Sequence, residues 1–447
     1  MNGETEKYLK KSYYYRKNGW IFLYIEGVPY ERGFQHGYHL ARELSRIIKT
    51  FKYVTFQNTG KDIAFFAEAA KKMFVPHIDS EFLEEMHGIT DGAVAGGCEI
   101  TFDELVAWNG NMELLNYWWP NASKKSQNER KNKVEHCSAF IATGDATKNN
   151  EIIMGHNSWS DFITGQFFNV ILDIVPSVGH RIFMQTAPGF IHSCTDFFVT
   201  GAGIIGTETT IKGFDKFKED EAPEFYRVRK AMQYGNNIDN WIEIMQQNNN
   251  GGYANSWLLG DINTNEIAQF EQGLEYSSIK KLRNGYFSGF NSPEDPQIRN
   301  LECTYTGYDD VRSTAARRVR WKQLLDSNYG QIDALKGGLL LEDHYDIYLE
   351  KKDNPSSRTI CGHSDVDPSE FVGITGTEPY NPRGCLDAKV VSSSLAQNFA
   401  FYARFGRSCG EPFIAEEFLK KHPQWDWQRG YLMDRPTQPW TLFKAKI

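Results

Sequence analysis

The sequence predicts an α+β fold, because three regions of different character follow one another along the chain. Residues 1–120 are mainly helix-patterned, residues 121–136 are polar and highly charged, and residues 137–447 hold many short strand patterns. Short strands that follow one another closely favour antiparallel pairing. We therefore expect a helical N-terminal segment (1–120), a polar linker (121–136) and a sheet-rich body (137–447).

The N-terminal segment begins with one strand and continues as helices. Residues 20–26, WIFLYIE, predict the strand. Glycines interrupt the start of the next segment, and its second half has apolar side chains at helical spacing from Leu40 to Phe51. Further helices are predicted at 62–75, 81–93 and 102–117.

The linker contrasts with both neighbours. Its sequence, NASKKSQNERKNKVE (121–135), holds seven charged residues and no hydrophobic side chain larger than Val. Such composition favours a solvated loop.

The body begins with a predicted hairpin of residues 139–143 and 151–157 around GDATKNN. Further strands are predicted at 256–261 and 266–271, and helices at 224–235, 239–248 and 312–326. We expect the basic face of the last helix to be solvated.

Composition excludes several classes of protein. The net charge is −8, the pI is about 5.8 and the basic clusters are short, which argues against nucleic-acid binding. The sequence contains no run of 18 apolar residues, so no transmembrane segment is predicted. No signal peptide is visible, so we expect a cytoplasmic protein by default, or a secreted, lysosomal or periplasmic one if the N-terminus is truncated.

The seven cysteines form no CxxC pair, which argues against a zinc ribbon or a thioredoxin-type site. Their sparse spacing fits a reduced interior or at most one or two disulfides. His36 and His39 are spaced i,i+3 without an acidic partner in register. We expect no metal and no cofactor.

The junction VEHCSAF carries the main functional prediction. A polar loop runs directly into Cys137, and a strand begins one residue later. A thiol there can attack the carbonyl of the preceding His136–Cys137 bond, and hydrolysis of the thioester leaves Cys137 as a new N-terminus. The freed α-amine, with a pKa of ~8, then serves as a base for the thiol on the same residue.

The predicted hairpin brings polar side chains beside Cys137. A symmetric register pairs Cys137 with Asn157 and turns His156 to the other face. A one-residue slip or a bulge exchanges the two roles, so the sequence leaves this choice open. Asn255, which follows a Gly-rich and Asn-rich turn, is a candidate oxyanion donor; the alternative is an ordinary turn residue.

The order of the motifs CSAFIATG, GHNSW, GAGIIGTETTI, YANSWLLGD and GCLDAKVVSSSLA resembles that of phospholipase B-like proteins, which belong to the N-terminal-nucleophile superfamily. The resemblance covers residues 137 to about 400. The segment GVPYERGFQHGYHLA and the helices up to WNGNMELLNYW resemble the propeptide of C45 penicillin acyltransferase-like autoproteolytic enzymes.

The resemblance implies a four-layer αββα fold with two stacked antiparallel sheets, and cleavage into fragments 1–136 and 137–447. It assigns site roles to Cys137, His156, Asn157, Thr209 and Asn255. Trp159 and Thr210 are expected beside the substrate, and His363 stands where the family pattern implies an arginine.

We therefore predict a self-processed cysteine acyl hydrolase whose substrate is a lipid or an N-acyl amide. Its partners would be that small molecule and its own cleaved N-terminal fragment, and homo-oligomerisation stays open. The first alternative is an acyltransferase or amidase that passes the acyl group to an amine. The second is a non-catalytic ligand-binding homologue.

Overall fold

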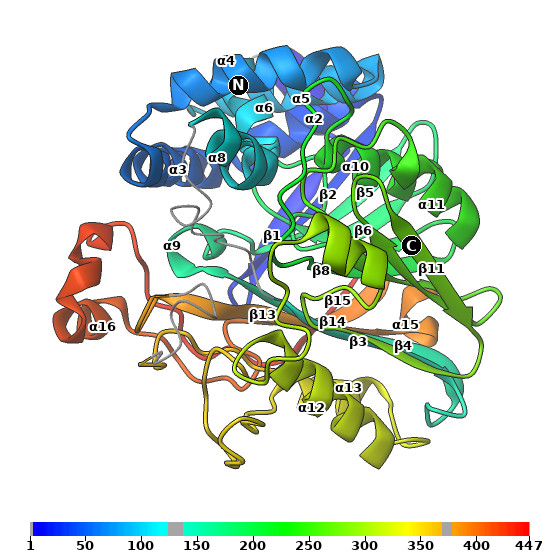
Figure 1. Ribbon diagram of the computed structural model, residues 1–447. Coiled ribbons are helices and arrows are strands. Elements are labelled where there is room, and N and C mark those ends of the chain that lie inside the picture. The colour runs from blue at the N-terminus through cyan, green and yellow to red at the C-terminus, as the bar shows by residue number, and fades with distance from the viewer. Residues whose placement is uncertain (1–2, 124–136, 369–377, 447) are drawn as a thin grey trace. The chain divides into compact units, whose positions relative to one another are not determined.

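The computed structural model describes residues 3–123, 137–368 and 378–446. The chain divides into two compact units, each built from separate stretches of sequence. Unit 1 comprises residues 1–125, 167–202 and 216–253, and unit 2 comprises residues 126–166, 203–215 and 254–447. Both units contain helices and strands (Figure 1).

Unit 1 is mainly helical. Its helices are α1 (Gly3–Leu9), α2 (Pro29–His39), α3 (Ala41–Thr59), α4 (Ile63–Met73), η1 (Val75–His77), α5 (Ser80–Ala95), α6 (Phe102–Asn109), α7 (Asn111–Glu113), η2 (Leu114–Trp118), α8 (Trp119–Ala122), α10 (Glu224–Tyr234) and α11 (Ile238–Gln246). Its strands are β1 (Tyr13–Lys17), β2 (Trp20–Gly27), β5 (Val170–Pro176), β6 (Ile182–Thr186) and β7 (Phe197–Thr200).

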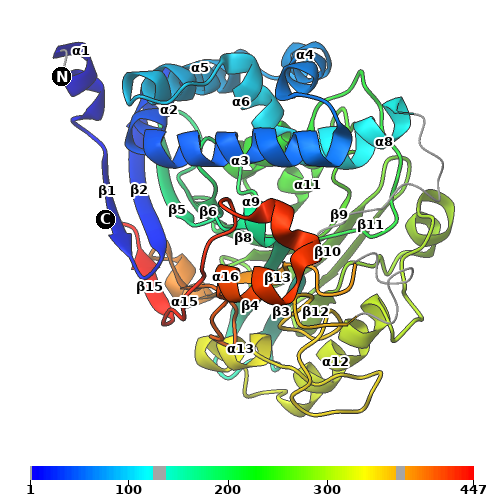
Figure 2. The ribbon, with the colours of Figure 1, turned by 90° about the vertical axis from the view of Figure 1, so that its left-hand side faces the viewer.

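The strands of unit 1 lie in the order β1-β2-β5-β6-β7, and α2 packs against β2 and β5 (Figure 2). The predicted strand at 20–26 is confirmed as β2. β2 and β5 run parallel, whereas the neighbouring pairs β1–β2, β5–β6 and β6–β7 are antiparallel. A parallel pair needs a long connection, which the chain between residues 27 and 170 provides.

Two of the glycines that interrupt the pattern before Leu40, Gly33 and Gly37, do not stop a helix. They lie in α2 and face α5. A Cβ on Gly33 would lie 2.0 Å from the carbonyl oxygen of Glu85, and one on Gly88 would lie 2.3 Å from that of Tyr30. Glycine on both helices therefore allows a backbone approach that any side chain would prevent.

Unit 2 holds most of the strands. They are β3 (Ser138–Gly144), β4 (Asn150–Asp161), β8 (Ile204–Thr210), β9 (Asn255–Asp261), β10 (Glu266–Gln272), β11 (Ser277–Leu282), β12 (Gly285–Gly289), β13 (Arg383–Ser392), β14 (Ala400–Phe405) and β15 (Thr441–Lys444). Its helices are α9 (Phe162–Gly165), η3 (Ile298–Glu302), α12 (Thr314–Ser327), α13 (Ala334–Leu341), α15 (Ser393–Ala396), α16 (Ala415–Lys421) and η4 (Pro423–Gln428).

These strands form two antiparallel layers, β8-β9-β10-β11 and β12-β3-β4-β13-β14-β15. The layers stack face to face, because a Cβ on Gly260 of β9 would lie 3.2 Å from side-chain carbons of Ile141 in β3 and Ile152 in β4. Phe140 and Ile153 point to the other face of the six-stranded sheet, where α12 and α13 cover them (Figure 1).

The predicted α+β class with two stacked antiparallel sheets is confirmed. Unit 2 supplies the sheet–sheet–helix layers, and unit 1 supplies helices packed on strands. The predicted helices at 62–75, 81–93, 224–235, 239–248 and 312–326 are confirmed within a few residues.

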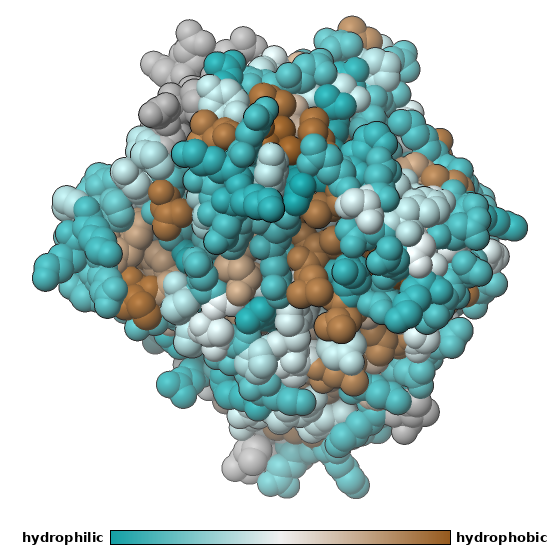
Figure 3. Space-filling model, turned by 90° about the horizontal axis from the view of Figure 1, so that it is seen from below, coloured by the Kyte–Doolittle hydropathy of each residue, from teal (hydrophilic) through white to brown (hydrophobic). Residues whose placement is uncertain are grey.

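No helix within the described ranges is long and apolar enough to cross a membrane. The face drawn in Figure 3 is mostly hydrophilic, and its apolar side chains are divided by polar ones. In unit 2, α13 exposes Leu335 and Leu339.

Candidate active site

The hairpin of β3 and β4 sets the surroundings of Cys137, and its register differs from the symmetric one. Ser138 pairs with Asn157 and Ala139 with His156, with an irregularity between Ala142 and Gly144. The extra residue near the turn shifts the register by one position. The side-chain alternation of the paired strands therefore puts His156 on the face of Cys137 and Asn157 on the opposite face.

Cys137 is buried and stands directly before β3. Its face of the sheet also carries Ile141, so it is the face turned toward β8–β11. Across β4 and β13, His156 pairs with Lys389, and Ser158 pairs with Asp387. Four buried polar side chains thus share the inter-sheet face with the thiol.

The polar side chains beyond His156 are paired with one another. Lys389 Nζ lies 2.5 Å from Asp387 Oδ1, and Ser158 Oγ donates to the same carboxylate at 2.9 Å. Lys389 also donates to Ser158. Neither the lysine nor the aspartate is exposed, so each supplies the counter-charge that the other needs in a desolvated position.

The His156 imidazole is fully buried. Burial lowers the pKa of His156 well below its ordinary value, and the positive charge of Lys389 lowers it further. The main chain of Glu208 in β8 opposes part of this shift. His156 is therefore a neutral imidazole at neutral pH, able to donate or accept a proton in a hydrogen bond but not to carry charge.

Arg317 of α12 approaches Cys137 from the helix-covered side. It donates to the Cys137 carbonyl oxygen and, at 3.2 Å, to Ser138 Oγ. Burial lowers the pKa of Arg317 to about 9, while the Cys137 thiol, which can become a thiolate, raises it. The attraction is reciprocal, so the guanidinium favours the thiolate.

Two further side chains hold Arg317 in place. Asn291 Oδ1 accepts from its guanidinium at 2.9 Å, and Asn291 Nδ2 donates to the carbonyl oxygen of Thr210 at 2.8 Å. The guanidinium carbon lies 4.7 Å from the centre of the Trp159 ring, within cation–π distance. Trp159, expected beside the substrate, is buried beneath this arginine.

Asn157, the other candidate partner of the thiol, binds the main chain on the helix-covered side. Its Nδ2 donates to the carbonyl oxygens of Leu341 at 2.8 Å and Ile360 at 3.0 Å. The structure thus brings His156 to the thiol's face and directs Asn157 toward the end of α13.

The sheet that contains β8 brings Thr209 to the space between the two sheets, which the Cys137 side chain also faces. A Cβ on Gly289, which pairs with Ala139, would lie 2.6 Å from Thr209 Cγ2. Thr209 pairs with Ser256, and Ser256 pairs with Glu271 and donates to it at 3.2 Å. The buried Thr209 hydroxyl makes no hydrogen bond to the residues that the structure describes.

Asn255 pairs with Thr210 at the end of β9 nearest to the Cys137 segment. Strand alternation puts both residues on the face opposite to Thr209 and Ser256. The Asn255 amide is buried and bonds to none of the described side chains or main-chain groups. Thr210 Oγ1 lies 3.5 Å from Glu208 Oε2.

His136, the predicted residue before the cleaved bond, lies outside the described residues. Sequence reasoning missed Ser158, Asn291 and Arg317 as side chains of this site, and it favours structural rather than catalytic roles for Asp387 and Lys389. The helix of Arg317 has a basic pattern that favoured a solvated face, and this expectation is wrong for Arg317 itself, which is 2% exposed. No short motif links Arg317 to Cys137, because the two are 180 positions apart.

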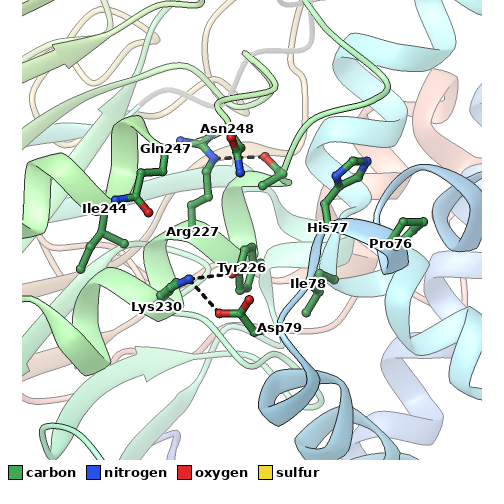
Figure 4. Close-up of a pocket in the computed structure, with 11 residues that line it drawn as sticks. Pro76, His77, Ile78, Asp79, Tyr226, Arg227, Lys230, Ile244, Gln247 and Asn248 are labelled. Carbon is green, nitrogen blue, oxygen red and sulfur yellow. Dashed lines mark hydrogen bonds and ion pairs between the residues drawn. The ribbon is translucent and has the colours of Figure 1, made fainter.

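A cavity of about 270 Å³ in unit 1 is a separate feature (Figure 4). Lys230, which lines this cavity, already bonds to Asp79 at 2.8 Å and to Tyr226 at 3.1 Å. The histidines weighed as metal ligands also have separate partners. His36 accepts from the Gly189 main chain, and His39 lies 2.8 Å from Ser12 Oγ.

Comparison with known proteins places these features in a family. The Phospholipase B family model matches residues 68–438, a wider range than the motif resemblance covered. An uncharacterized protein of Archaeoglobus fulgidus is 25% identical over 407 residues, which are 81% of this chain and 65% of the relative. Phospholipase B-like protein C of Dictyostelium discoideum is 24% identical over 389 residues, 76% of this chain and 67% of the relative.

Phospholipase B of Crotalus adamanteus is 27% identical over 299 residues, 60% of this chain and 51% of the relative. The chain thus spans about half to two thirds of the length of these relatives. A solved structure of conjugated bile acid hydrolase from Clostridium perfringens matches 61% of this chain and 84% of its own at 10% identity, with a TM-score of 0.30, too low to bear on the fold. Because the family model matches most of the sequence, the chain belongs to the phospholipase B family.

Proposed function

We propose that this protein is an acyl hydrolase whose nucleophile is the thiol of Cys137, freed by cleavage of the His136–Cys137 bond. The surroundings of Cys137 carry the proposal. Cys137 stands directly before β3, its carbonyl is held by the buried Arg317, and its face of the sheet carries buried His156. Membership of the phospholipase B family supports an acyl substrate.

Activation would begin with attack of the Cys137 sulfur on the carbonyl carbon of His136. The C–N bond to Cys137 breaks, its nitrogen takes up a proton, and a thioester joins the two residues. Water then hydrolyses the thioester, which leaves a carboxylate on His136 and a free amine on Cys137. The hydrogen bond from Arg317 to the Cys137 carbonyl would hold the residue in place during this exchange.

Turnover would use the same sulfur with its own α-amine as base. The amine takes the thiol proton, the thiolate attacks the substrate carbonyl, and the protonated amine then gives its proton to the departing alcohol or amine. Water resolves the acyl-thioester. Neutral His156 would orient groups beside the sulfur, and main-chain N–H groups would donate to the oxyanion, because strand alternation turns the Asn255 amide to the other face of its sheet.

A fatty-acyl ester or amide is the proposed substrate class. The names of the relatives, phospholipase B and phospholipase B-like proteins, support an ester-linked lipid. The proposed chemistry cleaves an amide by the same steps, so the two leaving groups must be compared directly.

The test compares the wild-type chain with Cys137→Ala, Cys137→Ser and the control Cys98→Ala. Cys98 is buried like Cys137 but lies in unit 1. Intact mass and N-terminal sequencing should give a new N-terminus at Cys137 for the wild type and for Cys98→Ala. Cys137→Ala should stay one full-length chain and release no fatty acid from a diacyl phospholipid or an N-acyl amide.

An active wild-type preparation in which residues 136 and 137 remain joined would refute the proposal. Transfer of the acyl group to an added amine in preference to water would instead identify an acyltransferase. Cys137→Ser, which keeps a hydroxyl nucleophile, should cleave slowly or stall.

A further inference from the structure

Four side chains of unit 2 direct one donor atom each toward a common point. They are His344, Cys361, His363 and Cys409, and their donor atoms all lie within 4.8 Å of one another. His344 Nε2 lies 3.0 Å from His363 Nε2. The same nitrogen of His363 lies 3.3 Å from Cys361 Sγ and 3.6 Å from Cys409 Sγ.

Hydrogen bonding does not explain this arrangement. A ring nitrogen has one site in the ring plane, for one proton or one lone pair, so His363 Nε2 can make one good hydrogen bond. It faces three partners. A metal ion at the centre would instead bind all four donor atoms at once.

The separations suit a tetrahedral zinc ion. Zinc binds sulfur at about 2.3 Å and imidazole nitrogen at about 2.0–2.1 Å, so donor atoms at the corners of a tetrahedron lie roughly 3.3–3.8 Å apart. Three of the six donor–donor separations, from 3.0 to 3.6 Å, are within a few tenths of an ångström of that range, and the whole set lies within 4.8 Å. Two sulfurs and two imidazoles in a tetrahedron favour zinc among the common metals.

The surroundings support the ligands as they do at known zinc sites. His344 Nδ1 lies 3.1 Å from Asp353 Oδ1, and this contact fixes the tautomer that leaves the Nε2 lone pair directed inward. Gly362, between two of the four residues, lies against Trp159, where a Cβ would be 2.2 Å from the ring. The thiol of Cys385 adjoins that of Cys361 and also donates to the Asp387 carbonyl oxygen at 3.5 Å, so a third sulfur lies beside the four donors.

We propose that His344, Cys361, His363 and Cys409 form a structural Zn²⁺ site. The protein supplies all four ligands, which is the arrangement of structural rather than catalytic zinc. Binding converts both thiols to thiolates and releases their two protons. The proposal is independent of the nucleophile assigned above.

The zinc site would stabilise residues that support the candidate active site. Cys361 packs against Trp159, and the Ile360 carbonyl accepts from Asn157. Trp159 in turn lies beneath Arg317, which bonds to the Cys137 carbonyl. Loss of the metal would loosen the loop that supports two residues of β4.

The test begins with the full-length wild-type chain, purified under reducing conditions. Elemental analysis should find one zinc per chain. After chelation, Co²⁺ added in place of zinc should give thiolate-to-cobalt charge-transfer bands and the strong d–d bands of a tetrahedral site. Wild-type chain that takes up neither ion, or that holds a Cys361–Cys409 disulfide under these conditions, would overturn the proposal.

Variants locate the site. Cys409→Ser and His344→Asn should lose stoichiometric metal, and the control Cys303→Ser, which is half-buried like Cys409, should keep it. Asp353→Asn alters an exposed side chain and should fold normally, with zinc affinity about 10–100-fold weaker. If Cys409→Ser fails to fold, the cobalt spectrum of the wild type and the zinc affinity of Asp353→Asn still test the proposal. Unchanged metal content in folded Cys409→Ser would refute the assignment.

Discussion

Arg317 donates a hydrogen bond to the main-chain carbonyl oxygen of Cys137, although the two residues are 180 positions apart. The contact joins α12 to the residue directly before β3. It gives the proposed nucleophile a fixed main chain and a nearby positive charge in a water-poor setting, where electrostatic interactions are strong.

Replacement of Arg317 by Met should therefore impair both self-cleavage and turnover. A charge-assisted hydrogen bond contributes about 1.5–3 kcal/mol, which corresponds to roughly a 10–100-fold loss of rate. The rate of appearance of the 137–447 fragment and the rate of acyl release measure the two effects. Arg318→Met, on the same helix but stacked on Tyr308, is the control and should behave like the wild type. Equal rates for Arg317→Met and Arg318→Met would show that Arg317 has no role in the site.

Asn157→Ala should lower stability while self-cleavage continues. The substitution leaves the carbonyls of Leu341 and Ile360 without their buried donor, at a cost of about 1–3 kcal/mol. Urea unfolding measures the stability, and mass spectrometry measures the cleavage. His156→Ala should instead keep the stability of the wild type and slow turnover. A stable Asn157→Ala chain that no longer cleaves itself would contradict this division of roles.

The buried pair of Lys389 and Asp387 should respond differently to single and double substitution. Lys389→Met leaves a buried carboxylate unpaired and should cost about 3–5 kcal/mol. The double variant Lys389→Met/Asp387→Leu removes both charges and should recover most of that loss. Denaturant unfolding of Lys389→Met, Asp387→Leu and the double variant gives the coupling energy between the two charges. Strictly additive effects would show that the pair is not coupled.

Glu271 should make stability depend on pH. Burial raises the pKa of Glu271 to about 7, although the main-chain N–H groups of Glu294 and Asp295 lower it in part. Between the unfolded value of about 4.5 and about 7, the folded state binds a proton that the unfolded state does not. The contribution of this group is therefore present below pH ~4.5 and is lost as the pH rises toward ~7, by about 3 kcal/mol.

The side chain at this position cannot ionise in Glu271→Gln, so the variant should not lose this stability as the pH rises. The stability of the variant relative to the wild type should thus rise across the same pH window, as measured by urea unfolding at several pH values. Glu243→Gln, on α11 of unit 1, is the control. A constant difference between Glu271→Gln and the wild type would show that the carboxyl keeps its ordinary pKa in the folded state.

Gly33→Ala should separate two helices of unit 1. The new methyl group would meet the Glu85 carbonyl oxygen, a main-chain atom that cannot rotate away. We expect a loss of more than about 3 kcal/mol or failure to fold, because overpacking moves the backbone. Gly60→Ala, where a Cβ meets nothing but φ is +71°, should cost only about 1 kcal/mol. Thermal unfolding of both variants measures the difference.

The sequence by itself determined many of the elements and the order of their motifs. The strand at 20–26, the helices and the 139–157 hairpin follow from local patterns of apolar and turn residues, which depend on neighbours in the chain. Cys137 could be proposed as the nucleophile in the same way, because the step from a polar loop to a predicted strand is visible in the residues on either side of it.

Only the tertiary structure decided which side chains share the face of Cys137. The irregularity after Ala142 shifts the register by one residue, and a shift of one residue exchanges His156 and Asn157, since strand side chains alternate with a period of two. Arg317 and the four donors from His344 to Cys409 come from distant stretches of chain. Their convergence depends on how sheets, helices and loops pack, which no local pattern in the sequence records.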